Sequence, residues 1–528
     1  MSGPFKILVA DDLSAEGVEI LRRAGEVTVQ TGLKEDALRD LLPPYHALVV
    51  RSATQVTAKA LEKARNLAVI GRAGIGVDNI DVAAATERGV VVMNTPDAGA
   101  TTTAEHALAL LFSLARNIPA ADAALKAGRW DKSKFVGSEL RGKVFLVVGL
   151  GKIGRIVAER GVALGMEVVG HDPYVDESRA PKGVRLVDLD DGLAEADFVS
   201  LHVPLMDNTR NLIDAARLAK MKPSARLVHA ARGGIVDETA LADALDEGRL
   251  AGAAVDVFCE EPLPAEHRLR KTKNIVLTPH LGASTNEAKG AVSIDVAEQV
   301  VTCLTRGIAL NGVNVPAIAP SEAHLLAPFL DLAHNLAAFL AQTFDGPLEG
   351  VRVMLQGALP ERASQSLLVA ALTGALQRRS EAPVTPVNAR RVAERLGVRT
   401  HVEASPMKRD FVSLVRIEMM IGGERHKVSG TVLGSRHGRM VELDSFLLDA
   451  IPEGPLLVTF HGDQPGVLGA VGTLLGQAQV NVSRLQLGVR EGGADEAVGI
   501  WNLDGPLSPD LLAAVRALPA VGRARFVQ

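Results

Sequence analysis

The feature that most constrains the fold is an alternation of short apolar runs, rich in β-branched residues, with Ala- and Leu-rich helical patterns. Near the start, strands are expected at 7–10, 47–50, 67–70 and 90–93, with helices at 14–24 and 81–88. Such alternation predicts right-handed βαβ units around a parallel sheet. After one long helix, expected from 102 to about 125, the alternation restarts with strands at 144–148, 167–170, 198–201, 226–230, 252–257 and 275–278. The sequence therefore predicts two parallel sheets.

The remainder of the chain has a different pattern. A helix is expected at 286–306, and turn formers and prolines at 311–320 indicate a linker. Helices at 323–343 and 364–378 and strands at 411–421 and 426–433 then indicate an α+β module. A second break at 451–455 precedes a tail with the order β-α-β-β-α-β, which is typical of a small ferredoxin-like sandwich.

Charge, cysteine content and hydropathy exclude several classes of protein. The 528 residues carry 57 Lys and Arg against 62 Asp and Glu, a net charge of −5, so no global positive field attracts nucleic acid. Two cysteines, without metal-ligand spacing, are too few for a disulfide framework and favour the cytosol, and no metal is expected. The most apolar stretch, at 325–344, is interrupted by polar residues, so we expect no membrane-spanning segment.

A glycine-rich turn in the second unit matches a dinucleotide-binding pattern. The string from Gly149 to Gly154 reads G-x-G-x-x-G, follows a strand and opens a helix, and Asp172 ends the next strand. Gly149 permits the tight turn, Gly151 lets a pyrophosphate approach the backbone, and Gly154 lets the helix pack on the strand. Asp172 suits the ribose hydroxyls of NAD and repels the 2′-phosphate of NADP. The alternative is a purely structural turn with Asp172 a surface acid.

Three residues lie just past predicted strand ends of the same sheet, where ligand crevices form in open α/β folds: Arg232, Glu261 and His280. Oxidation of a secondary alcohol needs a base for the hydroxyl proton, which suits His280. It needs a cation for the substrate carboxylate and the developing oxyanion, which suits Arg232. Glu261 suits the task of orienting the histidine. Each residue alone also has an ordinary structural explanation, and only the joint pattern argues for catalysis.

The strings around these residues resemble those of the D-isomer-specific 2-hydroxyacid dehydrogenases. They are Ala231-Arg232-Gly233-Gly234, Asp256-Val257-Phe258 with Glu261-Pro262, and Pro279-His280-Leu281-Gly282-Ala283. The resemblance implies that Arg232, Glu261 and His280 are the catalytic set, and that Asp256 contacts the nicotinamide carboxamide. The full set of NAD contacts that we expect is Gly149, Gly151, Lys152, Ile153, Gly154, Asp172, Ala230, Arg232, Asp256, His280, Gly282 and Ala283.

The resemblance also implies how the chain is divided. A Rossmann-type NAD domain, 98–286, is expected as an insertion in a flavodoxin-like α/β substrate domain formed by 1–97 and 287–313. An α+β intervening domain, 318–452, and a ferredoxin-like ACT domain, 455–528, are expected to follow.

Arginines in the first unit bear on the substrate. Arg51 and Ser52 follow one strand, and Arg72 and Gly74 follow another, so a phosphate site is plausible beside the alternative of solvated arginines. The chain is most similar to the branch of the family that oxidises 3-phospho-D-glycerate, whose members use these positions for the substrate phosphate and carboxylate. Three further contacts are expected from a neighbouring subunit of a homo-oligomer, a tetramer: Trp130, Lys132 and Lys134.

The tail resembles a small-ligand sensor domain. His461, Asp463 and Asn481 match its ligand turn and facing strand, which implies feedback by L-serine. Gln464 departs from the basic residue usual at its position, and a dimerisation module without a ligand is the alternative. In the preceding module, three residues are anion candidates or a solvated basic turn: Arg436, His437 and Arg439.

Two other functions stay open at this point. A glyoxylate or hydroxypyruvate reductase would keep the chemistry with another substrate, although such reductases usually end soon after the helix that follows His280. A non-catalytic NAD-sensing corepressor would keep the same Arg, Glu and His, but has no reason to carry a sensor tail.

Overall fold

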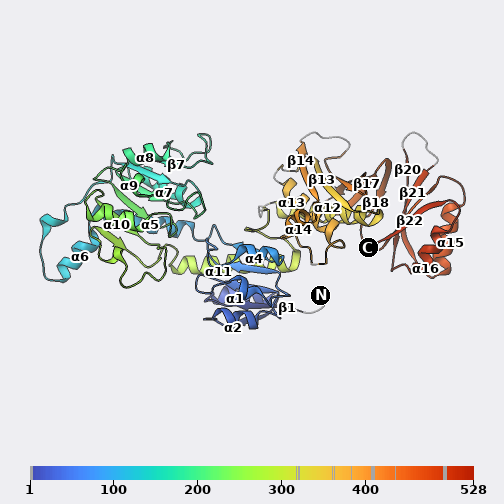
Figure 1. Cartoon of the computed structure of the whole chain (residues 1–528), viewed down its shortest axis with the longest axis horizontal. Helices are drawn as coiled ribbons and strands as arrows, with labels where there is room; N and C mark the ends of the chain where they lie inside the picture. The colour runs from blue at the N-terminus through green and yellow to red at the C-terminus, as the bar shows by residue number, and fades with distance from the viewer. Residues whose placement is uncertain are drawn as a thin grey trace.

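The structure is a computed structural model, and it describes residues 4–316, 318, 322–359, 361, 363–381, 383–405, 411–434, 436–490 and 496–528. The molecule is elongated, with two α/β units toward one end and a long, mainly antiparallel sheet toward the other (Figure 1). The expected fold class, two parallel α/β sheets followed by α+β structure, is confirmed.

The first unit is a five-stranded parallel sheet in the order β2-β1-β3-β4-β5. Its strands are β1 (Phe5–Val9), β2 (Gly25–Val29), β3 (Ala47–Val50), β4 (Val69–Arg72) and β5 (Val91–Asn94). Its helices are α1 (Ala15–Arg22), α2 (Glu35–Leu41), α3 (Ala58–Leu61) and α4 (Val82–Glu87). β3 is buried along its whole length, as expected for a strand covered on both faces. Strand β2 was not predicted, because it is a largely exposed edge strand without a continuous apolar run. Helix α2 was not predicted either; it is short and buries only Leu38.

The single long helix expected from 102 to about 125 is wrong. The segment forms α5 (Ala100–Ala115) and α6 (Ile118–Lys126), which meet at an angle of 63°. Asn117 between them has a left-handed φ of 52°, and Pro119 in the first turn of α6 has no N–H to continue the α5 ladder. α6 and the 3₁₀ turn after it, η1 (Lys132–Phe135), therefore project from one end of the molecule (Figure 1).

The second unit is a seven-stranded parallel sheet in the order β12-β11-β10-β9-β6-β7-β8. Its strands are β6 (Val144–Val148), β7 (Glu167–His171), β8 (Val184–Leu186), β9 (Phe198–Leu201), β10 (Arg226–His229), β11 (Gly252–Val255) and β12 (Ile275–Leu277). Its helices are α7 (Lys152–Ala163), α8 (Leu189–Glu195), α9 (Ala215–Leu218), α10 (Glu238–Asp246) and the 3₁₀ turn η2 (Arg268–Arg270). The strand order reverses between β6 and β9, and ligand crevices in open α/β folds form beside the carboxyl ends of the strands at such a point.

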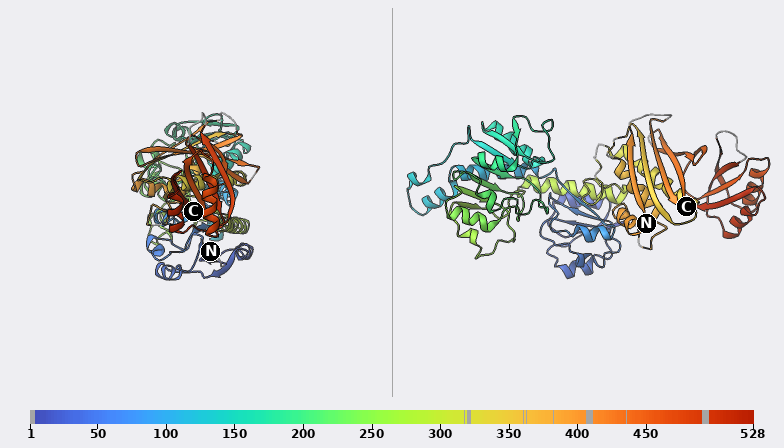
Figure 2. Two further views of the ribbon diagram at one scale, coloured as in Figure 1. Left: turned by 90° about the vertical axis from the view of Figure 1, so that its right-hand side faces the viewer. Right: turned by 45° about the horizontal axis from the view of Figure 1, so that its top comes forward.

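Helix α11 (Asn286–Arg306) returns the chain to the first unit. It runs along the first sheet in the right-hand view of Figure 2 and packs on α1 and β4. Val296 and Val300 of α11 lie where a Cβ at Gly71 would be, so the glycine in β4 permits this close approach. The first unit is therefore completed by a helix that follows the second unit in the sequence.

The rest of the chain forms one ten-stranded sheet in the order β14-β13-β15-β16-β17-β18-β20-β21-β19-β22. Its strands are β13 (Leu348–Gly357), β14 (Arg399–Ser405), β15 (Ser413–Ile421), β16 (Glu424–Leu433), β17 (His437–Leu443), β18 (Phe446–Ala450), β19 (Leu456–Gly462), β20 (Val482–Arg490), β21 (Glu496–Leu503) and β22 (Val521–Val527). Its helices are α12 (Ala323–Thr343), α13 (Ala363–Leu376), α14 (Ala389–Arg395), α15 (Val467–Gln477) and α16 (Pro509–Arg516).

The tail has the predicted order β19-α15-β20-β21-α16-β22, and its sheet continues that of the preceding module. Phe446 and Leu447 of β18 pair with Arg490 and Val489 of β20. One hydrophobic core extends from helix α12 to strands of the tail, where Leu456, Val458, Val498, Ile500 and Val527 join it. The segments before and after 451–455 thus share both a sheet and a core.

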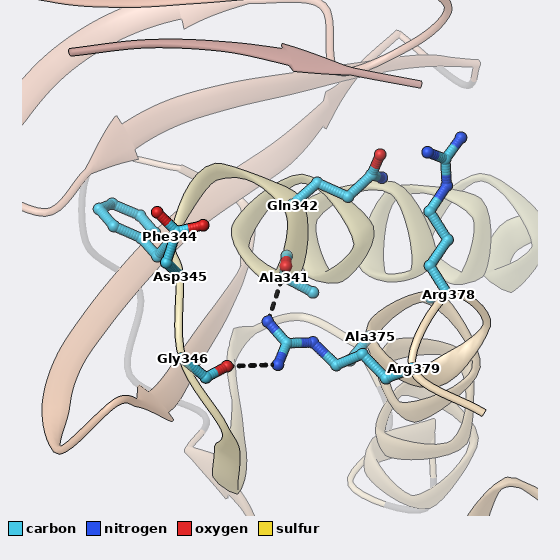
Figure 3. A pocket seen from close by; sticks show the side chains of 9 residues that line it. Ala341, Gln342, Phe344, Asp345, Gly346, Ala375, Arg378 and Arg379 are labelled. Atoms are coloured by element: carbon cyan, nitrogen blue, oxygen red, sulfur yellow. Dashed lines mark hydrogen bonds between the residues drawn. The ribbon is translucent and has the colours of Figure 1, made fainter.

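Helix α12 holds the end of the chain at this seam. Beside a cavity at the C-terminal ends of α12 and α13, Arg379 donates to the carbonyl oxygens of Ala341 (2.9 Å) and Gly346 (2.7 Å), as Figure 3 shows. The Gln342 amide exchanges two hydrogen bonds with the backbone of Gln528, at 3.0 and 3.1 Å. The last strand is therefore tied to the preceding module as well as to its own sheet.

We expected no segment long and apolar enough to span a membrane. Judged by length and composition alone, that prediction is wrong. The stretch 324–343 of α12 reaches that length and hydropathy, as does the bent pair α5–α6 taken together. Half of the α12 stretch is buried inside the molecule, where it packs on α13 and on strands β15–β17 and β22. Its apolar character is accounted for by this packing.

Candidate active site

His280 and Glu261 form a hydrogen-bonded pair at the carboxyl edge of the second sheet. The imidazole Nδ1 of His280 lies 2.7 Å from Oε2 of Glu261. The other carboxylate oxygen, Oε1, accepts the backbone N–H of Phe258 at 2.9 Å. Both oxygens of Glu261 are therefore held, and Nε2 of the half-exposed His280 ring is left to face a ligand.

The Glu261 carboxylate is kept ionised. Its partial burial raises its pKa, but the hydrogen bonds from His280 and from the Phe258 N–H outweigh this effect, so the pKa is lowered overall. An ionised Glu261 accepts Nδ1–H of His280 and favours the tautomer with an unprotonated Nε2. The pair has the form of a base and its orienting group.

The backbone at His280 is shaped by a buried carboxylate. Asp256 is fully buried, and its oxygens accept hydrogen bonds from Thr278 Oγ1 (2.6 Å) and from the backbone N–H groups of Leu281 (2.8 Å) and Gly282 (3.0 Å). Burial raises the Asp256 pKa, but these donors and His106, at 3.2 Å, lower it overall. The backbone N–H of His280 donates to the Asp256 carbonyl (2.9 Å), which supports its left-handed φ of 53°. Asp256 therefore organises the loop that carries His280, while its contact with the nicotinamide stays a prediction.

Arg232 comes from the neighbouring strand end and reaches across to the first unit. Its Nε donates to Oδ2 of Asp78 at 2.8 Å, and its Nη1 donates to the carbonyl of Ala231 at 2.6 Å. The loop after β10 also touches the loop after β11, because a Cβ at Gly233 would lie 1.9 Å from the carbonyl oxygen of Phe258. The ends of the adjacent strands β10, β11 and β12 thus bring Arg232, Glu261 and His280 to one edge.

The glycine turn after β6 has three different environments. Gly149 has a φ of 91°, and a Cβ there would lie 2.6 Å from the His202 carbonyl oxygen. A Cβ at Gly154 would lie 1.8 Å from the Gly149 carbonyl oxygen, so helix α7 approaches the strand as closely as the pattern predicted. Gly151 has nothing within 4 Å and leaves open space at the N-terminus of α7, which no side chain caps. A phosphate group fits these free N–H groups.

Asp172 borders the same turn. Its Oδ2 accepts the backbone N–H of Leu150 at 2.9 Å, and its Oδ1 accepts the N–H of Tyr174 at 3.0 Å. The carboxylate is therefore held beside the glycine turn, where a ribose next to the pyrophosphate would lie. Lys152 forms an ion pair with Asp97 on the connection between the two units, and Ile153 packs on the core. The other predicted NAD contacts, Ala230, Gly282 and Ala283, lie at the ends of β10 and β12.

The first unit contributes a cluster of arginines. The Arg72 guanidinium is mostly buried, and its Nε has no hydrogen-bond partner in the described structure. Burial, together with the nearby positive charges of Arg232 and Arg51, lowers the Arg72 pKa to about 10. Nη1 of Arg72 lies 1.6 Å from where a Cβ of Gly74 would be, so only glycine leaves room for it. An arginine cluster with more positive than negative charge around it is suited to a multiply charged anion.

Arg51 and Ser52 lie at the end of β3, beside this cluster. The backbone N–H of Arg51 donates to Asp11 at 2.6 Å, which positions the loop, and Nη1 of Arg51 has only a long contact of 3.4 Å to the Asp12 carbonyl. Ser52 is exposed. One more arginine and a hydroxyl are thus available beside Arg72 and Arg232.

The residues predicted for a serine site do not meet within one chain. His461 is buried and its Nδ1 lies 3.0 Å from the Gly462 carbonyl, and Asp463 is exposed in the following turn. Asn481 precedes β20 and bonds Asp504. Because β21 runs antiparallel to both β19 and β20, Asn481 lies at the opposite end of the sheet from His461, about 20 Å away at the rise of a strand.

The remaining predicted residues lie apart from this site. Trp130 is 83% exposed, and Lys132 and Lys134 are also exposed, in the segment that projects beyond α6. Arg436 and His437 are exposed, whereas Arg439 pairs with Asp449 at 3.2 Å. In the described ranges, no three His, Cys, Asp or Glu side chains are grouped as metal ligands.

Sequence reasoning missed several residues of the site. Asp78 faces Arg232, and His106 and Thr278 hold Asp256. Asn94 donates to the carbonyl of Ile75 and so fixes the turn between Gly74 and Gly76. The sequence did carry a signal for two of them. Asp78 follows the Gly-rich string after β4, and Asn94 is the last residue of β5.

Comparison with known proteins agrees with this geometry. The model of the D-isomer specific 2-hydroxyacid dehydrogenase NAD binding domain matches residues 108–282, and that of the D-3-phosphoglycerate dehydrogenase intervening domain matches 325–444. The chain is 41% identical over 525 residues to a D-3-phosphoglycerate dehydrogenase of Synechocystis, covering 99% of this chain and 94% of the relative. The chain belongs to the D-3-phosphoglycerate dehydrogenase family, among the D-isomer specific 2-hydroxyacid dehydrogenases. It is an NAD-dependent oxidoreductase.

Two further matches show how far each likeness extends. A D-3-phosphoglycerate dehydrogenase of Archaeoglobus fulgidus is 38% identical over 529 residues, covering 99% of this chain and all of the relative. The crystal structure of a glyoxylate reductase from Paecilomyes thermophila is 28% identical with a TM-score of 0.56, and the match covers 99% of that chain but only 59% of this one. The likeness to phosphoglycerate dehydrogenases of this family therefore includes the C-terminal modules, and the likeness to the reductase does not.

Proposed function

We propose that Arg232, Glu261 and His280 carry out the NAD-dependent oxidation of 3-phospho-D-glycerate to 3-phosphohydroxypyruvate, the first step of L-serine biosynthesis. The observation that carries this assignment is the His280–Glu261 pair, 2.7 Å apart, on the strand end next to Arg232. Nε2 of His280 takes the proton of the substrate C2 hydroxyl, and Glu261 stabilises the imidazolium that results. Bound NAD supplies the acceptor for the hydride that leaves C2.

Arg232 has two tasks in this reaction. Its planar fork pairs with the substrate carboxylate, which holds C2 in place. Its charge also stabilises negative charge that develops on the C2 oxygen as the proton leaves. Both tasks need N–H donors that the protein does not use. Among the described residues, Nε of Arg232 donates to Asp78 and Nη1 donates to the Ala231 carbonyl, which leaves Nη2 for the substrate.

For the cofactor, the fit of the glycine turn supports NAD bound by the residues predicted from the sequence. Gly151 and the uncapped N-terminus of α7 take the pyrophosphate, and Asp172 takes the adenosine ribose. Asp172 disfavours the 2′-phosphate of NADP, because two negative charges would meet there. On this proposal, residues 98–286 form the NAD domain, and 1–97 with 287–313 form the substrate domain.

The substrate phosphate is assigned to the arginine cluster. Arg72 is mostly buried, its Nε has no hydrogen-bond partner among the described residues, and Arg51 and Ser52 lie at the adjacent strand end. Leaving a buried guanidinium donor unpaired is costly, so the cluster favours a substrate with a second anionic group. Glyoxylate and hydroxypyruvate have no such group, which argues against a reductase as the main activity.

The C-terminal tail is proposed to sense L-serine. Since Asn481 lies about 20 Å from His461 within a chain, a site that uses both needs a second copy of the tail. Exposed apolar side chains on α6 and beyond it, Ile118, Leu125, Trp130 and Val136, also support a homo-oligomer, which we propose to be a tetramer. Free Cys259 and Cys303 support a reducing compartment, the cytosol.

The test is NADH formation from NAD and 3-phospho-D-glycerate at mildly alkaline pH, with a trap for the keto acid, with and without L-serine. We expect turnover that His280→Ala abolishes and that His401→Ala, a change at an exposed histidine of another module, leaves intact. Turnover that is insensitive to serine would remove the sensor assignment alone. Reduction of glyoxylate without oxidation of 3-phosphoglycerate would overturn the substrate assignment.

A further inference from the structure

One acidic side chain faces the anion-binding arginines, and the proposed function gives it no role. Asp78 belongs to the turn after β4 in the first unit, and its Oδ2 lies 2.8 Å from Nε of Arg232 in the second unit. The Asp78 carboxylate is 62% exposed, so it is not a buried structural group. It also opposes the effect of burial on the pKa of Arg72, so it lies close to that guanidinium too.

The turn that carries Asp78 is built around two guanidinium groups. A Cβ at Gly74 would lie 1.6 Å from Nη1 of Arg72, and a Cβ at Gly76 would lie 2.0 Å from Nη2 of Arg232. The same Gly76 Cβ would lie 2.7 Å from Oδ2 of Asp78. Gly74 and Gly76 therefore have no side chain and leave the space that the two guanidinium groups fill. The third position of this pattern, Asp78, places a carboxylate beside them.

We propose that Asp78 is a positioning residue that aims Arg232 at the substrate. By accepting Nε–H, Asp78 fixes the rotation of the guanidinium plane, while the Ala231 carbonyl accepts one proton of Nη1. The donors left over are the second proton of Nη1 and both protons of Nη2, and Nη2 is held beside Gly76. This inference rests on the proposed role of Arg232 and adds the group that orients it.

The charge of Asp78 has a second consequence. The charges of Arg51 and Arg232 act on Arg72, and the charge of Asp78 partly offsets them. Removing its charge strengthens the attraction for an anion while releasing the orientation of Arg232. The proposal therefore predicts opposite effects on binding and on turnover, which loss of folding does not produce.

The experiment compares Asp78→Ala and Asp78→Asn with Asp81→Asn in the full-length enzyme. Asp81 lies on the same segment and caps α4 by accepting the Ala84 N–H, a task that asparagine also performs. Asp81→Asn therefore removes the same charge as Asp78→Asn, but from a side chain with no hydrogen bond to Arg232. Expected for Asp78→Ala is a kcat lower by about 10- to 100-fold, the cost of a small misplacement of a catalytic group. Its KM for the hydroxy acid is expected to be unchanged or lower, with Asp78→Asn intermediate in kcat and Asp81→Asn like wild type.

A second measurement is independent of turnover. Oxalate mimics the carboxylate end of the substrate, and its inhibition constant in the presence of NAD is expected to fall in Asp78→Asn. A normal kcat in Asp78→Ala, or a KM that rises with an unchanged kcat, would overturn the proposal. If wild type reduces glyoxylate but does not oxidise 3-phosphoglycerate, the same variants are compared with glyoxylate, because Arg232 would hold any 2-keto acid carboxylate. Failure of the phosphoglycerate assignment is thus distinguished from failure of the Asp78 proposal.

Discussion

One buried and one partly buried histidine make the stability of the second unit depend on pH. His202 follows β9 and His229 ends β10, and burial lowers the pKa of His202 to about 3 and that of His229 to about 4. In the unfolded chain, both have a pKa of about 6.5. Below pH 6.5 the unfolded state therefore binds protons that the folded state excludes, and stability falls as pH falls.

The magnitude follows from the pKa difference. At pH 5, each histidine costs about 2 kcal/mol relative to pH 7.5, because each unit of pH below 6.5 costs about 1.4 kcal/mol per group, so the pair costs about 4 kcal/mol. The loss flattens only when the pH nears 4, where His229 begins to protonate in the folded state. Asp256 is the nearby charged group that partly offsets the effect of burial on His229.

Hydrogen exchange of peptides from β9 and β10, corrected for intrinsic rates, measures this change between pH 7.5 and 5. We expect His229→Leu to remove about half of the pH dependence and His401→Leu to leave it unchanged, since His401 is exposed. Opening free energies that do not change over this range, or an unaltered pH dependence in His229→Leu, would refute the reasoning.

Three substitutions test other parts of the site. Gly154→Ala places a Cβ 1.8 Å from the Gly149 carbonyl oxygen and is expected to lower stability by about 1–3 kcal/mol and to abolish NADH binding, measured by melting temperature and NADH fluorescence. Gly151→Ala, with nothing within 4 Å, is expected to keep the melting temperature and lose only NADH affinity. Glu261→Gln is expected to lower kcat by about 10²- to 10⁴-fold in steady-state assays, since it removes the charge beside the base. Normal NADH affinity in both glycine variants, or a wild-type kcat in Glu261→Gln, would contradict these assignments.

The parallel sheets could be predicted because their strands are short, buried and apolar on both faces. β6 and β9 were predicted to the residue, and helices α11 and α12 also match their expected bounds. Elements without that signal were missed, such as the exposed edge strand β2. The break between α5 and α6 was readable in principle, because Asn117 and Pro119 favour a helix end.

The continuity of the C-terminal sheet had no local signal. A Gly- and Pro-containing break at 451–455 indicates a boundary, and a boundary in sequence does not exclude hydrogen bonding between the strands on either side. Here β18 pairs with β20, which is not its neighbour in the chain, and α12 covers strands of both segments. Edge pairing of this kind depends on the relative placement of two modules, and periodicity does not carry that information.

The same distinction separates the site residues that could be predicted from those that were missed. Arg232, Glu261 and His280 follow strand ends of one parallel sheet, so topology alone brings them to one edge. Asp78 lies 154 residues from Arg232, at the edge of the other sheet, and the two side chains meet across the two units, which the Lys152–Asp97 ion pair also connects. Residues that act together at the carboxyl edge of one sheet can therefore be predicted from sequence. An interaction between the edges of two sheets is found only when the relative position of the sheets is known.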